Sequence, residues 1–331
     1  QKDLTEMLNV KNLAVSFKTR RGEVEAVRGI SFDLAKGEIL GVVGESGSGK
    51  SVTSYALMRI LDAGGSITAG DAIYSGIDLR RAAERDMRDI RGREISMIFQ
   101  NPRAALNPIR KVGHQIEDVL RQHAQATRYD ARAKAIAAME AVKIKDAEAR
   151  YHAYPFELSG GMCQRVMIAS ALIAEPRLLI ADEPTTALDV TIQAQILHLM
   201  RRLRDETDTS VLIITHDMGV VASVAARVCV MYGGRIVEQA EVHELFAAPR
   251  HPYTKLLLAT IPRMDGARKT ELFSISGMVP DVSAWPDGGR FRTRCPLATD
   301  HCASRPPLEP VGEGNDHVTA CWHSDKVEGL A

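Results

Sequence analysis

A loop with the residue types and spacing of a phosphate site occupies positions 44–51, which read Gly44-Glu45-Ser46-Gly47-Ser48-Gly49-Lys50-Ser51. It matches the pattern G-x-x-x-x-G-K-[ST]. The glycines let the backbone wrap around phosphates with its N–H groups pointing inward. We expect Lys50 to reach the β- and γ-phosphates of a nucleotide, ATP or GTP, and the Ser51 hydroxyl to coordinate Mg²⁺.

The elements around this loop decide whether the match is chance. A Gly- and Ser-rich turn can fit the pattern by accident. Here the loop follows the compact apolar run 39–43, typical of a strand buried in a parallel sheet, and precedes a helical run over 52–61. A helix N-terminus adds the positive end of a dipole beside the phosphates. This context favours phosphate binding.

A second apolar run, Leu178 to Ala181, ends in the two carboxylates Asp182 and Glu183. In an open α/β sheet, ligands bind beyond the carboxyl ends of the strands. We expect Asp182 to hold Mg²⁺, usually through water, and Glu183 to polarise the attacking water as general base. The alternative is a solvated acidic turn or helix cap, helped by Pro184. The phosphate loop upstream favours the catalytic interpretation.

Further strands and helices are needed to position these groups. Short strands are expected over 8–17 and 30–34, and apolar strands over 95–99 and 211–215. A helical stretch over 192–204 separates two of the buried strands, which indicates an α/β core. The following residues share the spacing of one helix face: Ala131, Ala135, Ala138, Met139 and Val142. We therefore predict a helical insertion over about 101–158 and, where proline becomes frequent, a C-terminal appendage over 241–331.

Composition excludes some classes of protein. The 331 residues carry 42 basic and 42 acidic side chains, which argues against nucleic-acid binding through a broad basic face. No run resembles a membrane span, and residues 1–10 lack the apolar core of a secretory signal, so a cytosolic location is expected. An odd number of cysteines argues against a disulfide framework; they are Cys163, Cys229, Cys295, Cys302 and Cys321.

The run Leu158-Ser159-Gly160-Gly161-Met162 narrows the class of ATPase. It offers a hydroxyl and consecutive glycine N–H groups at a helix start, which is a second anion site. The run resembles the LSGGQ signature of ABC ATPases. The resemblance implies that Ser159, Gly160 and Gly161 of one subunit close over ATP held by another. Met162 stands where the signature usually has Gln, but the anion-binding Ser and Gly residues are intact.

Other motifs of the ABC ATPases occur in the same order. Gln100 resembles the Q-loop residue that senses Mg²⁺ and water, and residues 187–189 resemble the D-loop. His216 resembles the switch histidine that contacts the γ-phosphate, and Phe17 stands where the family places an aromatic ring under adenine. A lone Gln or His is ordinarily structural or on the surface. Order and spacing favour the functional assignment for these two.

A narrower resemblance covers most of the chain. Residues 100–108, 251–254 and 261–262, together with the cysteine-bearing tail, look like the ATPases of oligopeptide/dipeptide importers. This implies a P-loop ABC ATPase domain over 7–240, with an antiparallel β subdomain and the helical insertion, followed by the appendage. It also implies ATP-driven solute import, with peptides, nickel chelates or other small solutes as substrates.

The implied partners are two transmembrane permease subunits, a second ATPase subunit, which is usually a different chain, and an extracytoplasmic substrate-binding protein. The implied location is the cytoplasmic face of the plasma membrane. The alternative is a soluble ABC ATPase acting on DNA or the ribosome. It is opposed by the single motif set and the lack of a long heptad insertion or basic run. A nucleotide-binding regulator without turnover is opposed by intact Lys50, Asp182, Glu183 and His216.

Three cysteines of the tail, Cys295, Cys302 and Cys321, are spaced C-x6-C-x18-C in a Pro-rich segment with little core of its own. The resembling tail carries four cysteines and can hold an iron–sulfur cluster, but Gly289 stands where its first cysteine lies. Three thiolates could hold a [4Fe–4S] cluster, with water or a nearby side chain on the fourth iron. They could instead bind zinc as Cys₃His or stay reduced thiols. The candidate fourth ligands are His301, His317 and His323.

Overall fold

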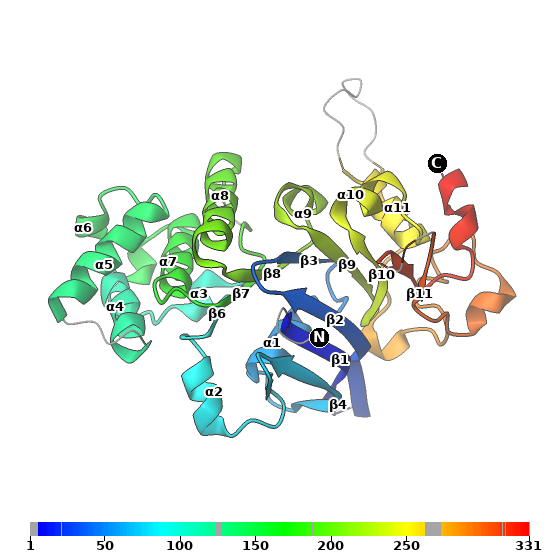
Figure 1. Ribbon diagram of the computed structural model, residues 1–331, viewed down its shortest axis with the longest axis horizontal. Coiled ribbons are helices and arrows are strands. Elements are labelled where there is room, and N and C mark those ends of the chain that lie inside the picture. Colours follow the sequence, from blue (N-terminus) through cyan, green and yellow to red (C-terminus); the bar gives the residue numbers. More distant parts are fainter. Residues whose placement is uncertain are drawn as a thin grey trace. The chain divides into compact units, whose positions relative to one another are not determined.

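The computed structural model describes residues 6–20, 22–123, 128–186, 188–261, 273–312, 314 and 316–330. The chain forms two compact units. The first contains residues 1–7, 34–39 and 81–214, and the second contains residues 8–33, 40–80 and 215–331. Figure 1 shows the elements of both.

The first unit is built on three adjacent parallel strands in the order β8-β7-β6. Their bounds are β6 Ile95–Ile98, β7 Leu178–Asp182 and β8 Ser210–Thr215. Every residue of these strands is buried, as expected for parallel strands covered on both faces. The strands predicted over 178–181 and 211–215 are therefore confirmed, and the one predicted over 95–99 ends one residue earlier.

The helices of the first unit are α2 Glu84–Ile90, α3 Pro102–Ala105, α4 Val112–His123, α5 Arg128–Ala141, α6 Ala147–Arg150, α7 Gly160–Leu172 and α8 Val190–Thr207. A 3₁₀ turn over Pro155–Glu157 precedes α7. Helices α3, α4 and α5 each pack against α7 (Figure 1). Of the face predicted over 131–142, Ala131, Ala135 and Met139 are buried on α5, Ala138 is half-buried, and Val142 is buried one residue after α5 ends. Helix α5, predicted from this periodicity, thus packs on α7, the helix that begins at the LSGGQ-like run.

The second unit contains an antiparallel sheet in the order β2-β1-β4-β5 and a group of strands in the order β11-β12-β10-β9-β3. The strands of the first are β1 Glu6–Thr19, β2 Gly22–Ala35, β4 Gly65–Tyr74 and β5 Ile77–Asp78. The strands of the second are β3 Ile39–Val43, β9 Arg227–Tyr232, β10 Arg235–Glu241, β11 Glu309–Pro310 and β12 Val318–Thr319. Strands β3 and β9 are parallel. The predicted α/β fold with an antiparallel β part is confirmed.

The helices of the second unit are α1 Lys50–Met58, α9 Met218–Val224, α10 Val242–Ala247 and α11 Pro252–Ala259, with 3₁₀ turns over Val282–Ala284, Asp300–Ala303 and Ser324–Gly329. The last turn, red in Figure 1, packs on the yellow α11. Among the described residues of the chain, no helix combines the length and apolarity that crossing a bilayer requires.

The segment after residue 280 has more core than its sequence pattern indicates. Trp285, Phe291 and Val327 are buried. The Phe291 ring lies 5.2 Å from that of Tyr232 and 5.3 Å from that of Tyr253, between centroids. Strand β12 extends the ladder by pairing with β10. These contacts join residues far apart in the chain, so they leave no local periodicity to detect.

Candidate nucleotide site

The phosphate loop joins β3 to α1, and its lysine lies against the loop backbone. The Lys50 ammonium donates to the carbonyl oxygens of Gly44 at 2.7 Å and Glu45 at 3.0 Å, and lies 3.4 Å from the Ser48 hydroxyl. Lys50 is only 7% exposed. Gly49 occupies the N-cap of α1 and has no side chain to accept from the first-turn amides. The loop therefore combines a buried cation with a helix start, an arrangement suited to anions.

Two glycines are required by the close packing of this loop. At Gly44 φ is +152°, and a Cβ added there would lie 2.2 Å from the Met231 carbonyl oxygen at the end of β9. At Gly49 φ is +97°, and a Cβ would lie 2.8 Å from the Ala26 carbonyl oxygen of β2. Neither conformation suits an L-residue with a side chain. The neighbouring strands thus fix the path of the loop.

The acidic pair lies at the carboxyl end of β7. Asp182 is the last residue of the strand and is fully buried. Glu183 has φ of +50°, and its amide donates to the Ile214 carbonyl of β8 at 2.8 Å. Its carboxylate accepts from the Thr186 hydroxyl at 3.1 Å. A left-handed conformation costs a non-glycine residue about 1–2 kcal/mol, and such outliers cluster at functional sites.

The signature run begins the 13-residue helix α7. Ser159 is the N-cap, and its hydroxyl accepts from the Met162 amide at 3.3 Å. Ser159 is exposed, and Gly160 and Gly161 form the first turn. This helix start presents a hydroxyl and backbone amides to the outside of its own unit. It can therefore meet an anion held by another molecule.

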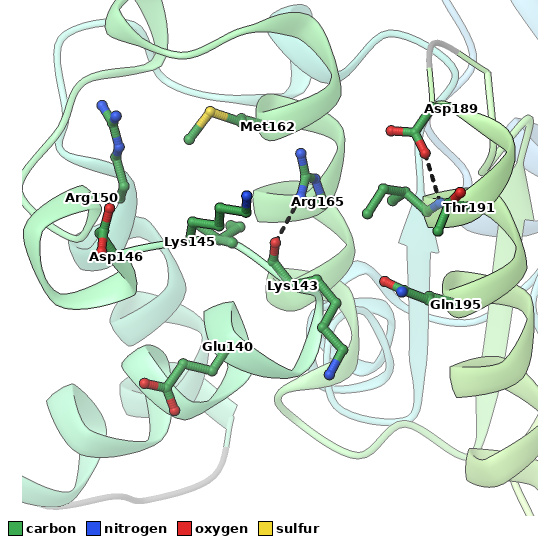
Figure 2. Close-up of a pocket in the computed structure, with 12 residues that line it drawn as sticks. Glu140, Lys143, Lys145, Asp146, Arg150, Met162, Arg165, Asp189, Thr191 and Gln195 are labelled. Carbon is green, nitrogen blue, oxygen red and sulfur yellow. Dashed lines mark hydrogen bonds between the residues drawn. The ribbon is translucent and has the colours of Figure 1, made fainter.

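A pocket of about 840 Å³ lies beside the start of α7, within the first unit (Figure 2). Its walls come from the end of α5, from α6, and from the starts of α7 and α8. Arg165 crosses it to donate to the Lys143 carbonyl at 2.7 Å, which ties the signature helix to the segment after α5. Met162, the departure from the usual signature, lines this pocket together with Asp189.

The remaining predicted residues divide between the units. Gln100 is exposed two residues after β6, in the unit that holds the signature and the acidic pair. His216 is exposed directly after β8, in the unit that holds the phosphate loop. Phe17 lies in β1 of that same unit, half-buried and opposite Gly65 of β4. Ala187 of the D-loop-like run and Pro262 lie outside the described residues.

Two structural links were not singled out by the sequence. Gln164 is fully buried in α7, and its side-chain amide donates to the Pro184 carbonyl at 2.9 Å, next to Glu183. Arg294, in the C-terminal segment, pairs with Glu45 of the phosphate loop at 2.7 Å. Arg294 and Glu45 lie 249 positions apart. No local motif could have joined them.

The three cysteines of the tail line one small pocket, of about 30 Å³, with His251, Phe291 and Trp322. Burial raises the pKa of the Cys321 thiol to about 11 and also raises that of Cys295, which favours the neutral thiols. Within the described ranges, no group of three or more His, Cys, Asp or Glu side chains is placed to hold a metal ion. The proposed cluster therefore receives no support from the structure.

The candidate fourth ligands have other contacts. His317 bonds to Glu238 at 2.7 Å and to Glu244 at 2.9 Å. His323 bonds to the Thr299 hydroxyl at 2.9 Å, and His301 lies edge-on against the Trp322 ring. Both ring nitrogens of His317 are engaged, so His317 would have to give up one of these carboxylate contacts to join a metal site.

Comparison with known proteins decides the family. The ABC transporter family model matches residues 27–186, and the model of the oligopeptide/dipeptide transporter C-terminal region matches residues 237–302. The oligopeptide transport ATP-binding protein OppD of Bacillus subtilis is 50% identical over 98% of this chain and 92% of its own length. The chain belongs to the ATP-binding proteins of the oligopeptide/dipeptide ABC transporters. It is thus an ABC-type ATPase subunit, as the resemblance implied.

Other relatives agree with this assignment. The dipeptide transport ATP-binding protein DppD of Bacillus subtilis is 47% identical over 98% of this chain and 96% of its own length. Among solved structures, a dimeric post-hydrolysis state of the ATP-binding cassette MJ0796 bound to ADP and Pi is 25% identical. It covers 71% of this chain and 99% of its own, with a TM-score of 0.66. The shared part is therefore the cassette.

Proposed function

We propose that this ABC ATPase subunit binds and hydrolyses ATP to power the import of peptides. The observation that best supports ATP binding is the buried Lys50 in an intact phosphate loop. This loop occurs in a chain that is 50% identical, over 98% of its length, to an oligopeptide transport ATP-binding protein. The soluble ATPase acting on DNA or the ribosome is not favoured by these relatives.

In the proposed reaction, Lys50 and the loop amides bind the β- and γ-phosphates. Glu183 accepts a proton from the water that attacks the γ-phosphorus. The hydrogen bond from its amide to Ile214 and the one that its carboxylate accepts from Thr186 fix where that carboxylate lies. His216 contacts the γ-phosphate and Phe17 stacks on adenine. Oxygen donors suit Mg²⁺, so Ser51, Asp182 and Gln100 are its proposed ligands or water-mediated partners, and the ion supplies charge that neutralises the phosphates.

The signature serves the ATP of a second ATPase subunit. Ser159, Gly160 and Gly161 support this because they form an exposed helix start at which anions bind favourably. ATP then acts as a ligand with different affinity for the closed and open pairs of subunits, and hydrolysis reopens the pair. The second subunit is proposed to be a different chain.

The other partners follow from the oligopeptide and dipeptide transport relatives. We infer two transmembrane permease subunits and, beyond them, an extracytoplasmic substrate-binding protein. The chain then works at the cytoplasmic face of the plasma membrane. The [4Fe–4S] cluster stays a prediction from the resemblance, and no step of the mechanism depends on it.

Co-purification followed by transport tests the proposal. The chain is expressed at natural levels with an affinity tag, and the membrane fraction is solubilised. We expect permease subunits to co-purify and the reconstituted assembly to hydrolyse ATP faster when peptide-loaded binding protein is added. Loading with a nickel chelate in place of peptide is the matched control. Recovery of nucleic acid or ribosomes without membrane subunits would reject the transport assignment.

A further inference from the structure

The second residue of the phosphate loop is held by the C-terminal segment. Arg294 forms a two-pronged pair with Glu45: one guanidinium nitrogen lies 2.7 Å from Oε2 and the other 3.2 Å from Oε1. The Arg294 side chain is 4% exposed and that of Glu45 is 28% exposed. Bidentate pairs with one largely buried partner have fixed geometry. The contact therefore ties residue 45 to residue 294 within one unit.

A second contact holds the backbone at the same residue. The amide of Glu45 donates to the hydroxyl of Tyr253 in α11 at 2.7 Å. Tyr253 is fully buried, with ring contacts to Tyr232 and Phe291. Both the side chain and the amide of Glu45 are thus engaged by residues of the oligopeptide/dipeptide-type C-terminal region. This amide is oriented by Tyr253.

Arg294 is itself fixed from several sides. Its Nε donates to the Ser276 carbonyl at 3.0 Å, and Nη2 donates to the carbonyl of Gly277 at 3.1 Å. Nη1 also lies 3.3 Å from the Tyr232 hydroxyl. A guanidinium with this many partners has little freedom to swing away. It can therefore act as a rigid support for the loop.

The charge of Glu45 gives this support a role in nucleotide binding. A carboxylate in a loop that receives phosphates would repel them, and the pair with Arg294 offsets that charge. The same pair holds the loop in the path that its glycines allow. We propose that Arg294 is a positioning residue for ATP binding, acting through Glu45 with Tyr253 as backbone support. The inference rests on the proposed function, because it concerns the same phosphate loop.

Coupling of this kind is reciprocal. If an attached C-terminal segment raises the affinity of the loop for ATP, bound ATP must favour the attached segment by the same factor. ATP should therefore slow proteolysis within the segment after residue 272. Substitution of Arg294 should reduce that protection.

A double-mutant cycle on the full chain separates this role from a general effect on folding. The four proteins are the wild type, R294M, E45Q and R294M/E45Q, and the dissociation constant of a fluorescent ATP analogue is measured for each. We expect R294M to raise Kd about tenfold in the wild-type background and less than about twofold in the E45Q background. R294K, which keeps the charge, should restore part of the loss. R292Q is the matched control, because Arg292 lines the cysteine pocket.

Y253F tests the backbone contact with little risk to folding, because only a hydroxyl is removed. We expect it to raise Kd about threefold. In the assembled transporter, R294M and Y253F should each raise KM for ATP, while kcat at saturating ATP changes less than about twofold.

Equal penalties for R294M in the two Glu45 backgrounds would overturn the inference, because a purely structural arginine does not depend on the neighbouring carboxylate. An unchanged Kd in both R294M and Y253F would overturn it as well. Failure of the wild type to bind ATP would instead reject the proposed function, so the two failures are distinguishable.

Discussion

Gly44→Ala is expected to damage the phosphate loop through a specific backbone clash. The added Cβ would lie 2.2 Å from the Met231 carbonyl oxygen, whereas ordinary contact begins at 3.4 Å, so the atoms must separate by 3.4 − 2.2 = 1.2 Å. Overpacking costs about 1–3 kcal/mol. A strained backbone conformation costs about as much again, because φ is +152° here. We predict destabilisation of about 2–6 kcal/mol when both terms apply.

The substitution should also reduce catalysis, because it displaces the phosphate loop. A misplacement of about 1 Å can cost about a hundredfold in rate, so ATP hydrolysis should fall by roughly that factor. Gly47→Ala is the matched control in the same loop. At Gly47 φ is +81°, but an added Cβ meets nothing within 4 Å. The control should lose only about 1–2 kcal/mol from the left-handed conformation.

Urea unfolding and steady-state ATP hydrolysis, measured on both variants in the same buffer, give the comparison. Gly44→Ala should be clearly the more damaging of the two substitutions in both assays. Equal stability and equal activity of the two variants would refute it, because only position 44 carries the clash with β9.

Three further predictions address the signature, the tail and its cysteines. Ser159→Arg should damage hydrolysis by the assembled transporter while this chain keeps its own ATP affinity; loss of binding by the isolated subunit would contradict the trans arrangement. Burial acts to lower the pKa of His317, but the hydrogen bonds that its ring donates to the Glu238 and Glu244 carboxylates outweigh burial, and the pKa is raised. Its stabilising contribution is therefore full below the ordinary histidine pKa and is lost as pH rises through the folded value. Urea unfolding measured from about pH 6 to about pH 9 should show this loss of stability in the wild type and not in His317→Gln. The same dependence of the unfolding free energy on pH in both proteins would contradict this prediction. Anaerobic purification with iron, zinc and sulfide analysis tests the cluster, which Cys295→Ser should remove with ATP binding unchanged; metal-free wild type would dismiss it.

Local patterns predicted the parts of the fold that local chemistry specifies. The buried runs 39–43, 178–181 and 211–215 are strands, and the helix face beginning at Ala131 is buried apart from the half-buried Ala138. In each case the side chains that decide the structure lie within one element. The roles assigned to Gln100, His216 and Phe17 rest on the resemblance and stay predictions.

Contacts between distant residues could not be predicted in this way. Arg294 binds Glu45 through a side chain whose sequence surroundings carry no motif for it. The buried His317 and the pairing of β12 with β10 likewise depend on partners more than seventy residues away. The expectation of little core in the tail failed for the same reason. Such contacts arise from the assembled fold, not from the period of any one segment.

Hydrolysis that depends on Glu183 is proposed to power peptide import. The most direct measurement reconstitutes the transporter with wild-type chain or Glu183→Gln and follows ATP hydrolysis and peptide uptake in the same vesicles. We predict that Glu183→Gln keeps ATP affinity within about twofold but loses at least about a hundredfold in turnover, with uptake lost in parallel. Hydrolysis and uptake at the wild-type rate in Glu183→Gln would contradict the account.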